Sequence, residues 1–562
     1  MTHHGWIPVA GKALPAALLS PFGRLFPARS LSYNSHAISM LAGAHGPMEE
    51  TVVRDADGKP VVKDGKIQIN TVFKADAKNP LPTGFTFLGQ FIDHDLTEFR
   101  VATPELGILP QNPTLGQRQR VHEDGEPTAT NGRSGRLDLD SVYGLLGSLD
   151  LHLFDDAGNF RNRKEGDIAI DIRRDVDYRD GRLIADPRND ENKIIVQLHI
   201  LFERLHDTLH VPTSPGQPPE KRADDIETTR TQVVKIYRQI VLYDYLPRIT
   251  GTDAILQVWE QLKLNKAFYQ AMNRRVRDTI GPLLEELVDW FPLKDGRPPQ
   301  APQELDSFLR ELVAMPVEFA HAVFRLGHTQ LLEAYRLQVG QPPIPLFFTG
   351  PVNQDPAPTQ DLRGNAKIEP PFVIDWQNFF GPSAANGRPL DPNLPRGIFR
   401  LPPPAVGEPP VSLAERNIRR GIDFGLPSGQ EAARILGSVY GGVDVLTPDQ
   451  ILDTDVMALY PELRTMDAGF AVATPLWFYV LQEAALKVPV EPHLGPVGAL
   501  IVAETILGSL AASEDFDLAQ CFAGGAQGFT DAIEAAKATP TVDDEQQIRT
   551  MVQLLNHIGT PV

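Results

Sequence analysis

The apolar and polar positions along the chain follow mainly the pattern of amphipathic helices. In residues 194–209, IIVQLHILFERLHDTL, apolar residues recur at three- and four-residue spacing with polar residues between them. Residues 231–246, 305–337 and 475–486 show the same spacing. We therefore predict a mainly α fold in which these four segments are helical.

Other regions lack this periodicity. Residues 61–72 contain short alternating pieces, which predict minor hairpin strands. Gly and Pro concentrate in residues 341–410, which predicts a long loop system with few regular elements. Residues 1–75 mix Gly, Pro and short apolar pieces, so we expect an irregular N-terminal arm followed by one large domain over residues 76–562.

The composition is that of an ordinary globular protein, with 42% hydrophobic and 22% charged residues in a chain of 562. The formal net charge is -19, and Lys and Arg form no dense runs, which argues against nucleic acid and anionic membrane surfaces as partners. Cys521 is the single cysteine. An internal disulfide and a cysteine-based zinc or iron–sulfur site are therefore excluded.

The first twenty residues lack the basic start, the continuous apolar stretch and the cleavage site of a signal peptide. No apolar run approaches the roughly 18 residues that a transmembrane helix needs. We expect a soluble protein that is cytoplasmic by default, with unconventional export left open. The sequence does not indicate the oligomeric state.

Common catalytic signatures are absent, since the chain has no GxGxxG, P-loop, GxSxG or HExxH motif. His206 and His210 have the i, i+4 spacing of a metal-binding pair on a helix. No carboxylate motif frames them, however, so the pattern favours a solvated or capped helix face.

Four short motifs carry candidate chemistry, and the first is LGQFIDHDLTE at residues 88–98. Read as a helix, this motif places Gln90, Asp93 and His94 on one face, with Asp95 about 100° away. A polar stripe in such an apolar segment is costly to bury without partners. The alternative is a solvent-facing stripe on an amphipathic helix, and the pattern alone does not decide between the two.

The sequence GQFxDHD resembles the distal helix of the animal-type haem peroxidases, in the peroxidase–cyclooxygenase superfamily. The resemblance implies a large, mainly helical domain that binds haem b. His94 would be the distal acid–base histidine and Gln90 a distal hydrogen-bonding partner. Asp93 would form an ester link to a haem methyl group, and Asp95 would bind Ca²⁺.

The second motif, SGRLDLDSVYG at residues 134–144, resembles the calcium loop of this family. Oxygen donors at alternating positions suit a cation that takes six to eight oxygen ligands. The resemblance implies that Ser134, Arg136 (through its carbonyl), Asp138 and Asp140 are ligands. Many relatives have a hydroxyl residue where Asp140 stands. The alternative is an exposed strand with alternating aspartates.

The third motif is DPRNDEN at residues 186–192. The resemblance implies that Arg188 stabilises charge on the departing peroxide oxygen and that Glu191 forms a second ester link to haem. Asn192 occupies the position of a haem-linked methionine in some relatives, so that sulfonium bond cannot form here. Taken alone, Arg188 and Glu191 are more typical of a surface ion pair.

The fourth motif pairs FRLGHT at residues 324–329 with Asn417. The resemblance implies that His328 ligates the haem iron and that Asn417 accepts a hydrogen bond from its other ring nitrogen. Arg325 would interact with a haem propionate or nearby backbone. An isolated histidine in an apolar helix is more usually a satisfied core residue. Downstream, RGIDFGLP departs from the family's RxRDHGLP at Ile422 and Phe424, without touching Asn417.

The four motifs occur in the family's order between residues 88 and 417. This order favours a haem peroxidase that reduces hydrogen peroxide and oxidises small electron donors such as halides, thiocyanate and phenols. Three alternatives remain: a fatty-acid dioxygenase on the same fold, a haem-free, calcium-stabilised binding protein, and an unrelated helical metalloprotein. The family's dioxygenases place a tyrosine three residues before the proximal histidine, where this chain has Arg325.

Overall fold

The computed structural model describes residues 22–52, 81–101, 129–286, 313–347, 361–401, 410–452, 469–487 and 493–562, apart from short gaps, together with three strands between residues 62 and 70. Helices dominate this part of the chain, and its strands form only two-stranded pairs. The prediction of a mainly α fold is confirmed.

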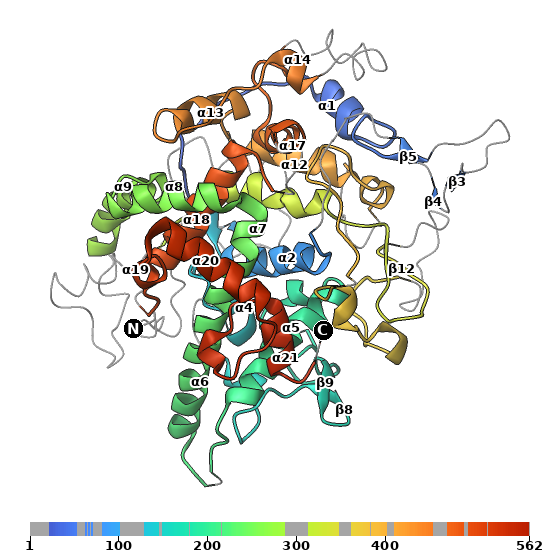
Figure 1. Ribbon diagram of the computed structural model, residues 1–562, viewed down its shortest axis with the longest axis vertical. Helices are drawn as coiled ribbons and strands as arrows, with labels where there is room; N and C mark the ends of the chain where they lie inside the picture. Colours follow the sequence, from blue (N-terminus) through green and yellow to red (C-terminus); the bar gives the residue numbers. More distant parts are fainter. Residues whose placement is uncertain are drawn as a thin grey trace.

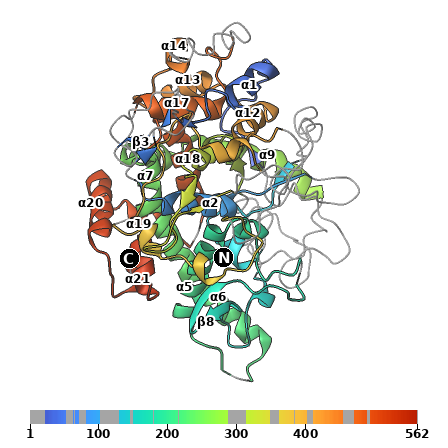
Figure 2. The same cartoon turned by 90° about the vertical axis from the view of Figure 1, so that its right-hand side faces the viewer.

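Helix α2 (Gly84–Leu96) lies in the middle of the molecule in both ribbon views, between α12 and α17 on one side and α5 and α6 on the other (Figures 1 and 2). Its apolar side chains are buried, which explains why it occupies the centre; they are Phe85, Phe87, Leu88, Phe91, Ile92 and Leu96. At Gly89 a Cβ atom would lie 2.5 Å from the Tyr245 hydroxyl oxygen, so glycine is required for this close approach.

Helix α5 (Lys193–Leu209) packs against α2 and confirms the helix expected over residues 194–209. Helix α6 (Pro219–Ile240) continues into one π-helical turn (Val241–Tyr245) and then into α7 (Leu246–Thr250). The helix expected over residues 231–246 is therefore present, with a π turn at its end. That turn carries Tyr245 to the Gly89 position of α2.

The remaining long helices surround this centre. They are α8 (Thr252–Lys263), α9 (Phe268–Glu286), α12 (Leu413–Asp423), α13 (Gly429–Gly437), α17 (Leu476–Lys487), α18 (Pro496–Ala511) and α20 (Gly525–Ala538). Helix α17 confirms the helix expected over residues 475–486. Helix α18 is buried at every position from Val497 to Leu510 and packs against α8, α7 and α17. It is therefore a core helix with no solvent-facing side.

Within the described part of residues 305–337, the prediction of α-helix is confirmed over only 5 residues and is wrong for the rest. Helix α11 (Val317–His321) ends at Ala322, whose φ of -138° and ψ of -77° leave the helical region. A 3₁₀ helix, η7 (Val323–Thr329), follows, and Ala334–Tyr335 then forms strand β11, paired with β12 (Ile344–Pro345). Apolar residues three apart fit a 3₁₀ helix as well as an α-helix, so spacing alone did not distinguish them.

The described N-terminal segment contacts later parts of the chain at several places, of which two involve regular elements. Strand β1 (Phe22–Gly23) pairs in parallel with β10 (Met315–Pro316), and the Glu318 carboxylate accepts hydrogen bonds from the N–H groups of residues 25 and 26 at 3.0 and 3.1 Å. Helix α1 (Ser35–Ala42) packs against α12. The expected hairpin near residues 61–72 is present as β3 (Val62–Lys63) and β4 (Lys66–Ile67).

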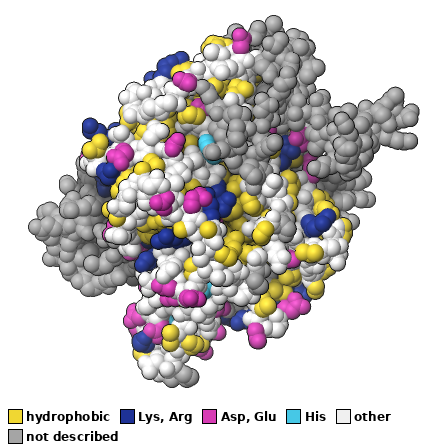
Figure 3. All heavy atoms as spheres, in the orientation of Figure 1, with side chains coloured by type: hydrophobic (Ala, Val, Ile, Leu, Met, Phe, Trp, Pro, Cys, Tyr) yellow, Lys and Arg dark blue, Asp and Glu magenta, His cyan; other side chains and the backbone are white. Residues whose placement is uncertain are grey.

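The described parts of residues 341–410 contain only strand β12 and three short 3₁₀ turns, as predicted: Pro370–Phe372, Trp376–Asn378 and Arg396–Phe399. Described acidic and basic side chains are interspersed on the face drawn in Figure 3. Among the described residues, no helix combines the length and apolarity that crossing a membrane requires.

Candidate functional site

The polar face of α2 meets the start of α5. His94 Nε2 lies 3.6 Å from Glu191 Oε1, and the Gln90 amide donates to the same oxygen. Asn192 donates to Gln90 Oε1 at 3.4 Å, while its own Oδ1 caps α5 by accepting from two backbone N–H groups. His94 is only 5% exposed. The solvent-facing alternative is therefore wrong for His94.

The hydrogen bond of the second ring nitrogen, Nδ1, determines which nitrogen of His94 carries the hydrogen. Nδ1 lies 2.8 Å from Asn189 Oδ1, an oxygen that can only accept, so Nδ1 carries the hydrogen and Nε2 holds a lone pair. Burial lowers the pKa of His94 to about 3, and the charge of Arg188 acts in the same direction. The imidazole is therefore neutral at pH 7, with Nε2 available as a proton acceptor.

Arg188 is held by Asp186 and by the C-terminal end of α2. Its Nη2 donates to Asp186 Oδ2 and to the His94 carbonyl, both at 2.7 Å, and its Nη1 donates to the Thr97 carbonyl at 2.6 Å. Burial alone would raise the pKa of Asp186, but Arg133 and Arg188 hold it well below its usual range. Arg188 therefore pairs with a buried aspartate, which replaces the surface ion pair with Glu191.

The two carboxyl groups expected to bond haem differ in their surroundings. Asp93 Oδ1 accepts a hydrogen bond from the Thr97 hydroxyl at 3.0 Å. Burial raises the pKa of Asp93, with Arg325 as the main opposing charge. Half of the Glu191 side-chain surface is accessible, yet partial desolvation by the surrounding protein raises its pKa to about 7. Both groups are therefore easier to protonate than free carboxyl groups.

His328 and Asn417 meet as predicted. His328 lies on the 3₁₀ helix η7, and its Nδ1 is 2.8 Å from Asn417 Nδ2 on α12. Asn417 Oδ1 is buried without a hydrogen-bond partner, and turning the amide over would let this oxygen accept from Nδ1–H. Within the described residues, the ring's Nε2 makes no hydrogen bond. Burial lowers the pKa of His328 to about 3, so the ring is neutral.

The η7 segment packs against α2, so the first and fourth motifs converge. A Cβ on Gly327 would lie 3.9 Å from the Thr86 carbonyl of α2. The charge of Arg325 lowers the pKa of both Asp93 and His328, which places its guanidinium within electrostatic range of both motifs. Its Nε also donates to the backbone carbonyl of residue 320 at 3.2 Å. Nearby backbone is thus one partner of Arg325, as predicted.

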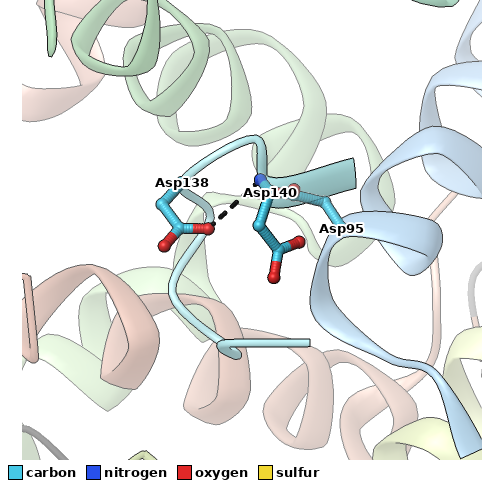
Figure 4. Close-up of side chains that lie close together, drawn as sticks. All are labelled: Asp95, Asp138 and Asp140. Atoms are coloured by element: carbon cyan, nitrogen blue, oxygen red, sulfur yellow. Dashed lines mark hydrogen bonds between the residues drawn. The ribbon is translucent and has the colours of Figure 1, made fainter. Parts of the chain in front are cut away.

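Asp95, Asp138 and Asp140 form a buried cluster whose carboxylate oxygens lie within 4.8 Å of one another. Figure 4 shows Asp138 and Asp140 on the loop and Asp95 on the neighbouring helix α2. Burial, together with repulsion from Asp138, raises the pKa of Asp95 to about 7. Asp140 Oδ1 is buried without a hydrogen-bond partner. A divalent cation would offset the cost of these three buried carboxylates.

The other expected calcium ligands are placed differently. Ser134 Oγ donates to Asp138 Oδ1 at 2.9 Å and therefore belongs to the cluster. The Arg136 carbonyl lies 3.4 Å from both Arg238 Nη2 and Ser513 Oγ, which donate to it. These two donors match the two lone pairs of the carbonyl oxygen, so the Arg136 carbonyl is already bonded within the protein and would have to release a donor to bind a cation.

The loop backbone has an unusual conformation. Gly135, Leu137 and Leu139 have φ values of 73°, 52° and 56°, in the left-handed region. For a leucine this conformation costs roughly 1–2 kcal/mol, and here both leucine side chains are fully buried, which offsets the cost. The exposed-strand alternative for residues 134–144 is therefore wrong. This backbone conformation directs the Leu139 N–H toward Asp95 Oδ2, at 3.2 Å.

Arg133 connects the acidic cluster to Arg188. Its Nη1 lies 3.5 Å from Asp140 Oδ1, and its Nη2 donates to Asp186, which in turn holds Arg188. Burial alone would lower the pKa of Arg133, but the carboxylates of Asp186, Asp140 and Glu98 raise it above its usual value. The guanidinium therefore stays charged and carries an electrostatic link between the two sites.

Sequence reasoning missed Arg133, Asp186 and Asn189. Two signals were present: Asp186 precedes a proline, which is typical of a helix N-cap, and Asn189 lies inside the third motif. His206 and His210 are not metal ligands here. Both are buried, and their ring nitrogens have protein partners: Tyr143 and the residue 158 carbonyl for His206, and Thr229 and the residue 157 carbonyl for His210.

No protein-family model and no curated protein matches the sequence. Among solved structures, the chain is similar to peroxidase A from Dictyostelium discoideum, at 14% identity over 92% of this chain and 94% of that chain, with a TM-score of 0.47. It is also similar to the fatty acid alpha-dioxygenase of Oryza sativa, at 12% identity over 99% of this chain and 87% of that chain, with a TM-score of 0.45. It is similar, too, to the fatty acid alpha-dioxygenase of Arabidopsis thaliana, at 12% identity over 99% of this chain and 82% of that chain, with a TM-score of 0.46.

Proposed function

We propose that this protein is a haem peroxidase, which reduces hydrogen peroxide and oxidises small electron donors. The observation that carries the proposal is the pair of neutral histidines on packed elements, each with one ring nitrogen held by an asparagine. Asn189 holds His94 and Asn417 holds His328, which leaves Nε2 of each ring without a hydrogen bond. The ordered resemblance of the four motifs supports the same function.

The donors present fit haem. His328 would hold the haem iron through Nε2 while Asn417 holds the other nitrogen, an arrangement that would fix the ring and its tautomer. The unpartnered Asn417 oxygen would complete that arrangement by accepting from Nδ1–H. Because an amide is a weaker acceptor than a carboxylate, His328 keeps little imidazolate character. Haem, when bound, supplies the redox chemistry.

His94 would handle the protons of the reaction. Neutral His94 accepts a proton from hydrogen peroxide at Nε2 and then donates it to the oxygen that leaves as water. Arg188 would stabilise negative charge developing on that oxygen, because Asp186 and the end of α2 hold its guanidinium in place. Gln90 would orient the Glu191 carboxyl beside them.

Asp93 and Glu191 would each form one ester link to a haem methyl group during turnover with peroxide, and Asn192 forms none. Each link replaces a methyl C–H bond and a carboxyl O–H bond with a C–O bond, and the hydrogen peroxide that takes up the two hydrogen atoms leaves as two water molecules. Acid–organic extraction should then leave haem on the protein, and peptide mass spectrometry should locate it at these two residues. The Asp93→Val and Glu191→Gln substitutions should each remove one link. Haem that extracts freely after turnover would contradict this part of the proposal.

Calcium would be held by Asp95, Ser134, Asp138 and Asp140, and the Arg136 carbonyl would join them by releasing one of its two present donors. An all-oxygen donor set of this size suits Ca²⁺ better than a small octahedral cation. The ion would be structural, since it ties the loop to the residue that follows His94.

The absence of a methionine link favours donors that are easily oxidised. We expect iodide, bromide, thiocyanate and phenols to be oxidised, and chloride only poorly at neutral pH. Two assays test the function together on the haem-loaded chain: oxidation of a phenol that depends on hydrogen peroxide, and oxygen uptake with an unsaturated fatty acid and a trace of peroxide.

Phenol oxidation without sustained oxygen uptake is the expected result, because Arg325 cannot serve as a radical relay in place of a tyrosine. Sustained uptake that yields lipid hydroperoxides would overturn the peroxidase proposal in favour of a dioxygenase. Failure to bind haem would favour the calcium-stabilised binding protein. His206→Gln, which changes a buried histidine outside this site, is the matched control and should leave both assays unchanged.

A further inference from the structure

A buried chain of hydrogen bonds runs from His94 into α5. His94 Nδ1 lies 2.8 Å from Asn189 Oδ1, and Asn189 Nδ2 lies 3.0 Å from His199 Nδ1. His199 Nε2 is 3.1 Å from Glu203 Oε1, and Glu203 Oε2 accepts from Asn162 at 2.8 Å. Asn189 and His199 are fully buried, and Glu203 is 2% exposed. Such a chain is costly to bury unless every member is paired.

Two contacts determine which atom donates and which accepts in each of these hydrogen bonds. Asn189 Nδ2 also lies 3.4 Å from the Ser141 carbonyl, an acceptor, so the amide nitrogen points that way. Turning the amide over would place two oxygens against each other. At the far end, an ionised Glu203 only accepts, so His199 Nε2 carries the hydrogen. His199 Nδ1 then accepts from Asn189, and Asn189 Oδ1 accepts from His94 Nδ1–H.

The reverse direction has a specific cost. It would require a protonated Glu203 that donates to His199 Nε2, and Asn189 Nδ2 would have to donate to His94. His94 Nε2 would then carry a hydrogen and could not accept one from a substrate. Asn162 donates to the other oxygen of Glu203, so in the forward direction the carboxyl group accepts on both sides and every member of the chain is paired.

The chain is carried by elements that are themselves well fixed. His199 and Glu203 lie one turn apart on α5, so both face the same side of a helix that packs against α2. Asn189 lies on the 3₁₀ turn Pro187–Asp190, whose N-cap is Asp186. Because these supports are rigid, the His94 ring has little freedom to rotate or to exchange its tautomer.

We propose that Asn189, His199 and Glu203 are positioning residues, which hold His94 in the one tautomer that leaves Nε2 as a proton acceptor. This inference rests on the proposed function in that it assigns His94 a proton-transfer role. Nothing in the four sequence motifs predicts it, because His199 and Glu203 lie downstream of the third motif. Loss of such a supporting partner typically lowers activity by about 10- to 100-fold.

The first test uses the haem-free protein, labelled with ¹⁵N at histidine. The ring-nitrogen shifts of His94, assigned by their loss in His94→Gln, should report hydrogen on Nδ1, and those of His199 should report hydrogen on Nε2. In Asn189→Leu the His94 signal should move toward a mixture of tautomers. Hydrogen on Nε2 of His94 in the unmodified protein would overturn the proposal.

The second test measures the bimolecular rate of reaction of the haem-loaded protein with hydrogen peroxide. Glu203→Gln keeps an oxygen that accepts from His199 Nε2–H, whereas Glu203→Leu removes it. We expect the glutamine variant to stay close to the unmodified rate and the leucine variant to fall by about 10- to 100-fold. Equal rates in both variants would contradict the proposal. His206→Gln, on the same helix, is the control.

The two tests separate this inference from the proposed function. If the protein fails to react with peroxide but His94 shows the Nδ1–H tautomer only while Asn189 is present, the positioning chain stands and the peroxidase proposal fails. If the unmodified protein reacts with peroxide, and the Glu203 and Asn189 variants have the same His94 tautomer and the same rate, the positioning proposal fails and the peroxidase proposal stands. Should Asn189→Leu not fold, the two Glu203 variants still decide the outcome.

Discussion

The folded protein disfavours the ionised form of Glu191. Its pKa is raised to about 7, mainly by burial, so the folded chain keeps the proton to higher pH than the unfolded chain does. Below the unfolded value both states are protonated and the folded state loses nothing. Between the unfolded value and about pH 7 the unfolded chain is ionised while the folded chain still holds its proton. Stability therefore falls as pH rises across that window and levels off above it.

The variant Glu191→Gln removes this titration. Haem-free Glu191→Gln should match the unmodified protein in thermal stability near pH 4 and exceed it at pH 8, because glutamine resembles the protonated side chain. Thermal unfolding across that range measures the difference. Glu369→Gln, at an exposed position, controls for the loss of a negative charge. An identical pH dependence of Glu191→Gln and the unmodified protein would contradict this prediction.

Some site residues could be predicted from the sequence immediately around them, and others could not. His94, His328 and Asn417 were predicted because each lies in a short motif, and the contact between His328 and Asn417 is confirmed. Arg133 and Asn189 were missed because their roles depend on partners 53 and 95 positions away in the chain. Pairings at such separation leave no periodic pattern in the sequence.

At the scale of elements, the loop over residues 134–140 and helix α2 form one unit through the acidic cluster. Removing Ca²⁺ should destabilise the protein, since three buried carboxylates would then repel one another. Calcium at about 100 times its Kd would stabilise the fold by about 2.7 kcal/mol. Thermal unfolding with and without a chelator measures this effect, and peroxide reduction should slow in parallel.

The variant Asp138→Ala should abolish the effect of the chelator. Asp531→Ala, which removes an exposed carboxylate of α20, should keep that effect. A chelator that changes neither stability nor activity, together with an unchanged melting temperature in Asp138→Ala, would reject the calcium site.

Arg133 supports the contact between this loop and the segment that carries Arg188. Arg133→Met would leave Asp140 without its buried cationic partner and Asp186 with Arg188 alone, and breaking a buried ion pair costs about 3–5 kcal/mol. The matched control is Arg29→Met, which breaks the surface pair with Glu431 and should cost about 0–1 kcal/mol. Urea unfolding compares the two variants. Equal destabilisation would show that the buried network contributes no more than a surface pair.

Helices whose apolar spacing continues over several turns were predicted well, whereas shorter elements were not. Helices α5 and α17 follow from their spacing because each presents an apolar face over three or more turns. The segment from Val323 to Thr329 adopts a 3₁₀ helix because Ala322 breaks the preceding helix, and because the Trp477 indole N–H is bonded to the Arg325 carbonyl at 3.3 Å. That tertiary contact cannot be seen in the local sequence.

At the scale of the whole molecule, α2 lies between two groups of helices that bring distant parts of the chain to its surface (Figures 1 and 2). Residues 187–190 and residues 323–329 reach it from different groups. The mainly α fold follows from the sequence, whereas this arrangement around α2 required the structure. It gives the two candidate histidines their separate, fixed environments.

The most direct test of the central claim is rapid mixing of the haem-loaded full chain with hydrogen peroxide, followed by absorption, for three proteins. The unmodified protein should change its haem spectrum quickly and return to the starting spectrum when a phenol is added. His94→Ala should keep haem but react about 10²- to 10⁴-fold more slowly. His328→Ala should lose haem or its axial-histidine spectrum. A His94→Ala variant that reacts as fast as the unmodified protein, or a His328→Ala variant with an unchanged spectrum, would contradict the account.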